Sequence, residues 1–378
     1  MNIVATADWH IHEFQEFSKS VPVIWDAHTL RFIESSTGKL MNSRLKNTLD
    51  GICDIRDWCV KNGIKYVLNA GDVFHKRGTI SVNAFNAAYK VIESFKSAGL
   101  DLIIIAGNHD QVDATDNPAT SIFTFTNIAT VIESPTILKL SSANSVRFAN
   151  LCGKSEKPTE DIQVLALPYS KNKNYLMSEF HRLKAQLDNP HRSILLAHLG
   201  IEGGIVGSGM VMVNEDYNLS DLIPEDWKYI VLGHFHRPQL LAPNALYTGT
   251  PVQNSFSDEL PITYYGGYNG FYILGEEEAK FMPILRPRFI TVTNPADITD
   301  KDYFRIKSTE ETVISESNVR VEVQKDYSQP IRSKITLGDS FEDSILKYME
   351  ENYKLENKEE VLKLGQEILL EAREIMIE

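Results

Sequence analysis

The sequence feature that most constrains the fold is the apolar-rich run 100–106, which leads into the tetrapeptide Gly107-Asn108-His109-Asp110. Such a run followed by glycine predicts a buried strand that ends in a tight turn. Asparagine and histidine at a strand tip are poorly suited to a core. They are well suited to a binding site, because open α/β sheets bind ligands outside the carboxyl ends of their strands. We therefore expect a site at this tip.

Strands and helices alternate along the first part of the chain. The predicted strands are residues 2–7, 66–70 and 100–106, and the helices between them are residues 43–61 and 82–98. This alternation predicts an α/β fold with a mostly parallel sheet. Residues 11–42 show little periodicity, and we expect a long loop or insertion there, beside the first strand tip.

The middle of the chain is richer in strands. Further strands are predicted at residues 146–151, 162–168, 193–197 and 229–232, and a helix at residues 175–187. A glycine-rich loop, residues 203–209, follows the third of these strands. Two interpretations of the loop remain open, a flexible connection and a mobile flap over the site.

The sequence pattern changes near residue 284, and from this change we predict that the chain has three parts. Residues 1–283 form a large α/β domain, and residues 284–340 form a small α+β domain with strand-like runs at 289–292 and 319–323. Residues 341–378 form a helical tail whose last helix is amphipathic. That helix either docks on its own domain or binds a partner.

Composition narrows the class of protein. The 378 residues are 43% hydrophobic, as expected of a globular chain with a core. The net charge of −13 argues against a protein that binds nucleic acid through its overall charge. The charge is uneven, because residues 341–378 contain eleven acidic and five basic residues and so carry a net charge of −6. We expect no signal peptide and no membrane span, because a strand begins almost at once and no apolar run reaches about 18 residues. Three cysteines match no disulfide or zinc pattern, so reduced intracellular thiols are expected.

Five predicted strand tips carry side chains that bind metals. They are Asp8 with His10, Asp72, Asn108 with His109, His198, and His234 with His236. Alternate side chains at a strand end point the same way, so each closely spaced pair can aim two ligands at one place. A lone histidine at a strand end is more often a surface or core residue. Five such tips together favour a metal site. The histidines at positions 12, 28, 181 and 191 lack this context and receive no role.

The donor set indicates the chemistry. Oxygen and imidazole nitrogen without thiolate suit manganese, iron or zinc and disfavour a structural zinc site. Seven ligands are too many for one ion and suit two, with Asp72 as a shared carboxylate. Such a pair of ions clamps a phosphoryl group and activates a hydroxide for in-line attack. His109 is then left to donate a proton or hydrogen bond to the leaving oxygen.

In this order, the motifs Asp-x-His, Gly-Asp, Gly-Asn-His-Asp, His and Gly-His-x-His resemble the calcineurin-like metallophosphoesterase superfamily. Within it, the chain resembles the nuclease subunit of DNA double-strand-break repair complexes, SbcD in bacteria, and its counterparts in the recombination endonucleases of tailed phages. Three stretches carry this closer resemblance: residues 71–75, residues 233–239, and Gly249-Thr250-Pro251 followed by Ser255-Phe256. The motifs cover about residues 1–260.

The resemblance implies a β-sandwich flanked by helices, with a small α+β capping domain and C-terminal helices. It implies one metal held by Asp8, His10, Asp72 and His236, and another held by Asp72, Asn108, His198 and His234. It makes His109 the catalytic histidine. His75 falls where many members carry an aspartate that orients this histidine, although some repair nucleases also have histidine there. The orienting partner of His109 therefore stays open.

The function implied is that of a manganese-dependent DNA exonuclease or endonuclease with two divalent ions. The implied partners are DNA and an SMC-like ATPase subunit of the SbcC type, with a homodimer inside a heterotetramer and a location in the cytoplasm, that of the host if the chain is phage-encoded. A small-molecule or cyclic-nucleotide phosphodiesterase is the alternative, since fold and metals do not separate the two. A phosphoprotein phosphatase is disfavoured because its Asp-Arg-Gly motif is missing. A non-catalytic scaffold is disfavoured because all the ligands are present.

Overall fold

The computed structural model describes residues 2–112, 120–141, 146–148, 161–206, 209–308 and 316–323, together with Lys347, Val361, Lys363 and Leu364. The chain divides into two compact units. The larger comprises Met1–Lys307 and Val313–Val321, and the smaller comprises Ser308–Thr312 and Glu322–Glu378. The predicted helical tail lies outside the described residues except for those last four positions, which are helical. The division into 1–283, 284–340 and 341–378 stays a prediction.

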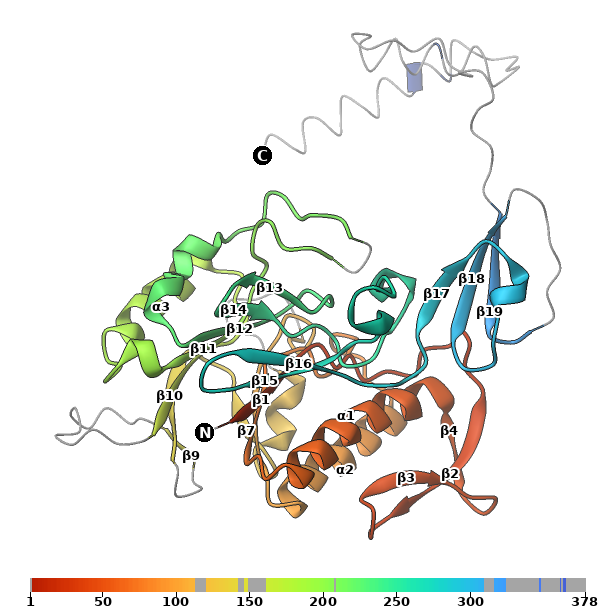
Figure 1. Ribbon diagram of the computed structural model, residues 1–378, viewed down its shortest axis with the longest axis horizontal. Coiled ribbons are helices and arrows are strands. Elements are labelled where there is room, and N and C mark those ends of the chain that lie inside the picture. Colours follow the sequence, from red (N-terminus) through yellow and green to blue (C-terminus); the bar gives the residue numbers. More distant parts are fainter. Residues whose placement is uncertain are drawn as a thin grey trace. The chain divides into compact units, whose positions relative to one another are not determined.

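Two sheets form the centre of the larger unit (Figure 1). The first has the order β16-β15-β1-β5-β6-β7 and the second β13-β14-β12-β11-β10-β8-β9. The strands of the first sheet are β1 (Ile3–Thr6), β5 (Tyr66–Asn69), β6 (Asp101–Ile105), β7 (Thr130–Ile132), β15 (Gly270–Leu274) and β16 (Ala279–Pro283). Those of the second are β8 (Thr136–Leu140), β9 (Val146–Phe148), β10 (Ile162–Leu167), β11 (Ile194–His198), β12 (Tyr229–Gly233), β13 (Gln239–Ala242) and β14 (Ala245–Tyr247).

Three apolar clusters hold the layers together. One lies between the sheets and takes buried side chains from both, such as Leu68 and Ile103 from the first and Val164 and Leu196 from the second. A second packs helices α1 (Ser43–Lys61) and α2 (Val82–Ser97) on the outer face of the first sheet, and a third packs α3 (Lys173–Lys184) on the second. The result is a β-sandwich flanked by helices, and the predicted α/β class is confirmed.

The parallel strands bring the predicted tips together. Strands β1, β5 and β6 are parallel neighbours in the first sheet, and β11 and β12 are parallel neighbours in the second. All five predicted tips therefore follow the carboxyl ends of adjacent parallel strands. His198 Nδ1 lies 2.7 Å from the carbonyl oxygen of Ala70, which joins the tip of β11 to the tip of β5. The two sheets thus present their ligand-bearing ends to each other.

The insertion at residues 11–42 is more ordered than the sequence indicated. It contains a three-stranded antiparallel sheet of order β3-β2-β4, with β2 (Ser20–Asp26), β3 (Arg31–Glu34) and β4 (Lys39–Asn42). One face packs Trp25, Phe32 and Met41 against the core under α1 and α2. The other face exposes apolar side chains, including those of Ile24 and Leu40. Apolar residues on both faces hide the alternation that identifies a half-buried strand, so the expected loop was wrong.

A second small sheet, of order β17-β18-β19, follows the sandwich. It contains β17 (Phe289–Val292), β18 (Tyr303–Ser308) and β19 (Val319–Val323). The sequence predicted the first and last strands but not β18. Among the described residues, the 3-10 helices are η1 (Ser121–Phe125), η2 (Pro190–Arg192), η3 (Leu219–Leu222), η4 (Pro224–Asp226), η5 (Phe256–Asp258), η6 (Tyr265–Gly267) and η7 (Pro295–Asp297).

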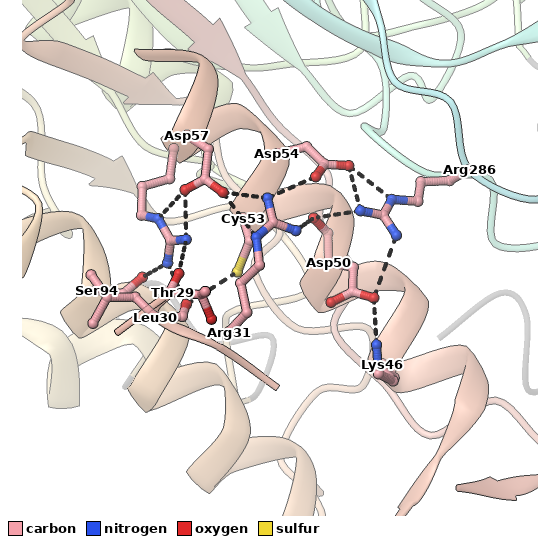
Figure 2. Close-up of polar contacts among 11 residues, drawn as sticks. Thr29, Leu30, Arg31, Lys46, Asp50, Cys53, Asp54, Asp57, Ser94 and Arg286 are labelled. Carbon is pink, nitrogen blue, oxygen red and sulfur yellow. Dashed lines mark hydrogen bonds and ion pairs between the residues drawn. The ribbon is translucent and has the colours of Figure 1, made fainter. Parts of the chain in front are cut away.

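An acidic face of α1 ties distant segments to the sandwich (Figure 2). Asp54 accepts from Arg31 of β3 at 2.8 Å through one oxygen and from Arg286 at 2.6 Å through the other. Asp57 adds a second carboxylate for Arg31, and Asp50 a second one for Arg286. Because Arg286 follows β16, this network fixes the start of the small sheet β17–β19 against α1. Among the described residues, no helix has the length and apolarity needed to cross a membrane.

We expect Asp54→Asn to lower the free energy of unfolding by about 1 kcal/mol, because the shared carboxylate is only partly exposed and serves two guanidinium groups. The loss should shrink at about 1 M salt, which screens such pairs. Urea denaturation at two salt concentrations measures both effects. Asp188→Asn, which breaks one exposed pair with Lys139, is the control and should change stability less. Equal effects of the two substitutions would contradict the bridging role.

Candidate metal centre

The structure gathers all seven predicted ligands at the junction of the two sheets. Donor atoms of Asp8, His10 and His236 lie within 4.8 Å of one another, as do those of Asp8, Asp72 and His198. Asn108 Oδ1 completes the group, at 2.9 Å from His198 Nε2 and 3.2 Å from His234 Nδ1. Five strand tips, far apart in the sequence, therefore contribute to one cluster.

Strained backbone marks four of these positions. Asp8, His10, Asp72 and His234 have φ angles of 53°, 45°, 57° and 108°. Left-handed conformations of residues other than glycine cost about 1–3 kcal/mol each and concentrate at functional sites. Main-chain hydrogen bonds hold the strained turns side by side: Asp8 N–H donates to the Gly71 carbonyl at 2.9 Å, and His10 N–H donates to the Asp72 carbonyl at 3.1 Å.

Asp72 lies between the two sets of histidines. Its Oδ1 accepts from the His109 main-chain N–H at 2.8 Å. Its Oδ2 lies 3.7 Å from His10 Nε2 and 3.5 Å from His198 Nε2. Gly107 makes room for this carboxylate, because a Cβ at that position would lie 2.1 Å from Asp72 Oδ1. One carboxylate oxygen thus faces imidazoles on either side.

Asp110, the last residue of the central tetrapeptide, is a buried support for this arrangement. Its Oδ2 accepts from the N–H groups of Asp72 and Gly107, at 2.9 and 3.0 Å. Its Oδ1 accepts from the N–H groups of Val73 and Phe74, at 2.9 and 3.3 Å. The carboxylate therefore joins the loop after β5 to the loop after β6. Asp110 belongs to the motif read from the sequence, but the motif alone indicated no role for it.

Hydrogen bonds fix which nitrogen of two histidines faces the cluster. His198 Nδ1 lies against the Ala70 carbonyl oxygen, which can only accept, so Nδ1 carries the proton. His236 Nδ1 lies 2.8 Å from Asp258 Oδ1. In both rings Nδ1 is the donor to its partner, which leaves Nε2 as the atom that faces a metal, as outer partners of metal-binding histidines commonly arrange. Although burial opposes it, the charge of Asp258 and its hydrogen bond raise the pKa of His236 to about 9, so a cation bound at Nε2 would displace a proton. The sequence did not reveal the role of Asp258, because its spacing from Ser255 predicts a capped turn but nothing about a metal.

The donor set fits divalent cations. His10 Nε2 and His236 Nε2 lie 2.8 Å apart, and buried His10 Nδ1 has no hydrogen-bond partner among the described residues. Burial, and then the nearby charge of Asp72, raise the pKa of Asp8 to about 6, although neighbouring histidines oppose this. Burial and the neighbouring imidazoles of His198 and His236 lower the pKa of His234 to about 3. A cation would relieve this conflict, because it favours ionised carboxylates and neutral imidazoles.

His109 stands beside the cluster, half-buried. Its ring meets that of His10 edge to face, with centroids 4.8 Å apart. Its Nδ1 contacts the main-chain carbonyl oxygen of His75, and the two rings stack at 5.7 Å. Burial, and then the imidazoles of His12 and His109, lower the pKa of His75 to about 4. The orienting partner left open by the sequence is thus a backbone carbonyl, with the His75 ring as a packing surface.

The glycine-rich loop is described apart from residues 207 and 208. Gly203 N–H donates to the Met212 carbonyl at 2.9 Å, and Met212 N–H donates to the Gly204 carbonyl at 2.8 Å. Gln239 bonds both the N–H and the carbonyl of Ile205. The described part of the loop is therefore a paired turn attached to the segment that follows His236. The flap interpretation stays a prediction.

The chain is similar to known proteins. The family of calcineurin-like phosphoesterases matches residues 1–238. The SbcD subunit of the nuclease SbcCD from Bacillus subtilis is 24% identical over 277 residues, which are 68% of this chain and 63% of that protein. The SbcD subunit of the nuclease SbcCD from Rhodobacter capsulatus is 23% identical over 319 residues, 76% of this chain and 70% of the relative. The chain thus spans less than two thirds of the length of the Bacillus protein.

A solved structure of a dimetal phosphatase from Danio rerio also aligns with this chain. The alignment covers 72% of this chain and 91% of the phosphatase, with 10% identity and a TM-score of 0.37.

We expect Asp110→Asn to lower the free energy of unfolding by about 1–3 kcal/mol, because an amide NH₂ would face two buried N–H donors and leave them unsatisfied. Urea denaturation measures the loss. Asp188→Asn, at the surface, is the matched control and should leave stability nearly unchanged. If Asp110→Asn were as stable as the wild type, the carboxylate would not be holding the two loops together.

Proposed function

Because this chain belongs to the calcineurin-like phosphoesterase family, we propose that it is a DNA nuclease that cleaves phosphodiester bonds with two divalent cations. Family membership makes it a hydrolase of phosphoester bonds, and the resemblance predicted from the motifs is confirmed. The observation that carries the proposed metal-dependent hydrolysis is the cluster of seven oxygen and nitrogen donors around Asp72. Both bacterial relatives are named as nucleases, which supports a nucleic acid as the substrate.

The ligands divide into two sets that share Asp72. In the proposal, Asp8, His10 and His236 bind one cation with Asp72, and Asn108, His198 and His234 bind the other. The contacts of Asp72 Oδ2 with His10 Nε2 on one side and His198 Nε2 on the other support this division. Two such cations, when bound, polarise a phosphoryl group and lower the pKa of a hydrolytic water. Donors without thiolate suit manganese, which we propose as the metal.

His109 is proposed as the proton donor to the leaving oxygen. Its Nδ1 is anchored on the His75 carbonyl, which leaves Nε2 as the atom that exchanges a proton. Its ring is half-buried beside His10, so it adjoins the cluster and remains open to substrate. A positioned acid or base of this kind contributes about 10²–10⁴-fold to rate.

Exposed positive charge next to the cluster supports a polyanionic substrate. Lys76 and Arg77 directly follow His75, and both are exposed. Neither forms an ion pair with any residue that the structure describes. In a chain of net charge −13, two exposed cations directly after His75 favour phosphate binding there.

The partners are proposed from the relatives. Both are named as subunits of a nuclease with more than one kind of subunit. We propose that this chain likewise acts with an SMC-like ATPase, as a homodimer within a larger assembly. The acidic residues 341–378 are the proposed contact with the ATPase, since they would repel DNA.

A single assay tests the substrate class. The purified chain is given Mn²⁺ with linear duplex DNA or with a chromogenic phosphodiester, with and without the ATPase. We expect both substrates to be cleaved and DNA to have the higher kcat/KM. Cleavage of the small phosphodiester alone, under all conditions, would instead support a small-molecule phosphodiesterase.

We expect His109→Ser to lower kcat on DNA by about 10²–10⁴-fold while the content of bound metal stays at the wild-type value. His181→Ser is the control, because His181 lies on α3 away from the cluster. Steady-state kinetics and elemental analysis of the same preparations give both quantities. Loss of metal in the His109 variant would make His109 a ligand and overturn its proposed role.

A further inference from the structure

The turn that carries Asp258 lies behind one half of the proposed centre. Asp258 is 2% exposed, and its Oδ1 lies 2.8 Å from His236 Nδ1. Its Oδ2 accepts from the N–H groups of Asn254 and Ser255, at 2.7 and 3.3 Å. Both oxygens are therefore engaged, one by the imidazole and one by the turn. The position of the His236 ring depends on the position of this turn.

Strand β17 holds the turn from one side. Phe289 N–H donates to Gln253 Oε1 at 2.6 Å, and Thr291 N–H donates to Glu259 Oε1 at 2.6 Å. The Thr291 hydroxyl donates to the other oxygen of Glu259 at 2.5 Å. Phe256 packs edge to face on Phe289, with centroids 4.9 Å apart. Contacts before, within and after η5 thus fix residues 253–259 to the small sheet.

Arg44, in the first turn of α1, holds the turn from another side. It is 2% exposed, and its Nη2 donates to the Asn254 carbonyl oxygen at 2.7 Å. Its guanidinium carbon lies 4.7 Å from the ring centroid of Phe289 in β17 and 4.9 Å from that of Tyr303 in β18. A buried guanidinium placed between aromatic rings is a firm contact, since the desolvated cation gains from their faces. Arg44 therefore connects the small sheet, the turn and α1.

The other half of the centre is supported differently. His198 is the last residue of β11, and its Nδ1 is held by the main-chain carbonyl of Ala70. Both belong to the strand ends of the sandwich. The orientation of His198 therefore follows from the sandwich alone, whereas that of His236 depends on a side chain from a turn attached to β17.

We propose that Asp258 is a positioning residue for His236, and that the small sheet β17–β18 controls one of the two metal positions through the turn 253–259. This inference rests on the metal assignment of the proposed function, but it does not depend on DNA being the substrate. It predicts that a substitution that disturbs the sheet weakens the binding of one cation, the one assigned to Asp8, His10 and His236. The cation assigned to His198 should be bound as before.

The substitution Asp258→Asn tests the first step. The amide keeps the shape of the side chain but removes the charge that holds His236 Nδ1 as a donor. Loss of such an outer partner costs about 10–100-fold in metal affinity. Calorimetric titration of the metal-free chain with Mn²⁺ should show two binding events in the wild type. In Asp258→Asn we expect one event weakened by about that factor and the other unchanged.

The substitution Thr291→Val tests the second step. It removes the hydroxyl that binds Glu259 and touches no proposed ligand. We expect it to weaken the same binding event, by less than Asp258→Asn does. In the double variant we expect the loss in binding free energy to be smaller than the sum of the losses in the two single variants, because both substitutions act through one turn. Asp188→Asn is the matched control and should titrate like the wild type.

The outcomes separate this inference from the proposed function. Suppose that the wild type binds two Mn²⁺ ions. If Asp258→Asn then weakens both binding events equally, or weakens neither, the positioning role of Asp258 is wrong while the proposed metal centre is retained. If the wild type binds no Mn²⁺, the metal assignment itself fails. Thermal melting of each metal-free variant identifies unfolding. If Asp258→Asn does not fold, Thr291→Val still tests the proposal. A Mn²⁺ titration of Thr291→Val that matches that of the wild type would contradict the claim that the small sheet controls this metal position.

Discussion

Asp8 and Asp72 are almost fully buried among imidazoles, and the placement of these carboxylates constrains everything around them. An ionised carboxylate in such surroundings is costly unless cations or hydrogen bonds compensate it. The imidazoles cannot all supply that charge, because burial and their mutual repulsion lower the pKa values of His10 and His234. Divalent cations bound by both kinds of ligand resolve the conflict. The junction of the two sheets is therefore a candidate metal centre.

The surrounding fold supplies the rigidity that this junction needs. The two sheets bury a common apolar core and place five strand ends at one edge. Strained turns at Asp8, His10 and Asp72 persist because main-chain hydrogen bonds and the Asp110 carboxylate hold neighbouring loops together. Farther out, Arg286 and Arg31 attach the small sheet and the insertion to α1 (Figure 2). Rigidity thus extends from the sandwich to the segments that support the ligands.

Local patterns in the sequence predicted the α/β class and the strand ends that carry the candidate ligands, and the resemblance to the family implied the sandwich. The helix predicted at residues 43–61 has those bounds in the structure, since Asn42 caps its start and Asn62 its end. The seven candidate ligands came together because each follows an apolar strand, and parallel strands end at a common edge. These features depend on residues close in the sequence, which periodicity and turn signals describe well.

The features that the sequence did not reveal depend on long-range contacts. The sheet formed by β2, β3 and β4 buries one apolar face and exposes another, which obscures its period. Asp258 gains its role only because the turn 253–259 folds back to His236, 22 residues earlier in the chain. The His75 carbonyl supports His109 through the backbone, and no side-chain pattern encodes that contact.

The central claim is that one buried carboxylate serves two cations, and metal counting in Asp72→Asn tests it most directly. Metal-free wild-type and variant chains are dialysed against Mn²⁺, and bound metal per chain is measured by elemental analysis. The account predicts two ions in the wild type and loss of both from the variant, because a single bridging charge is removed from two sites. Two ions at full occupancy in Asp72→Asn would contradict it.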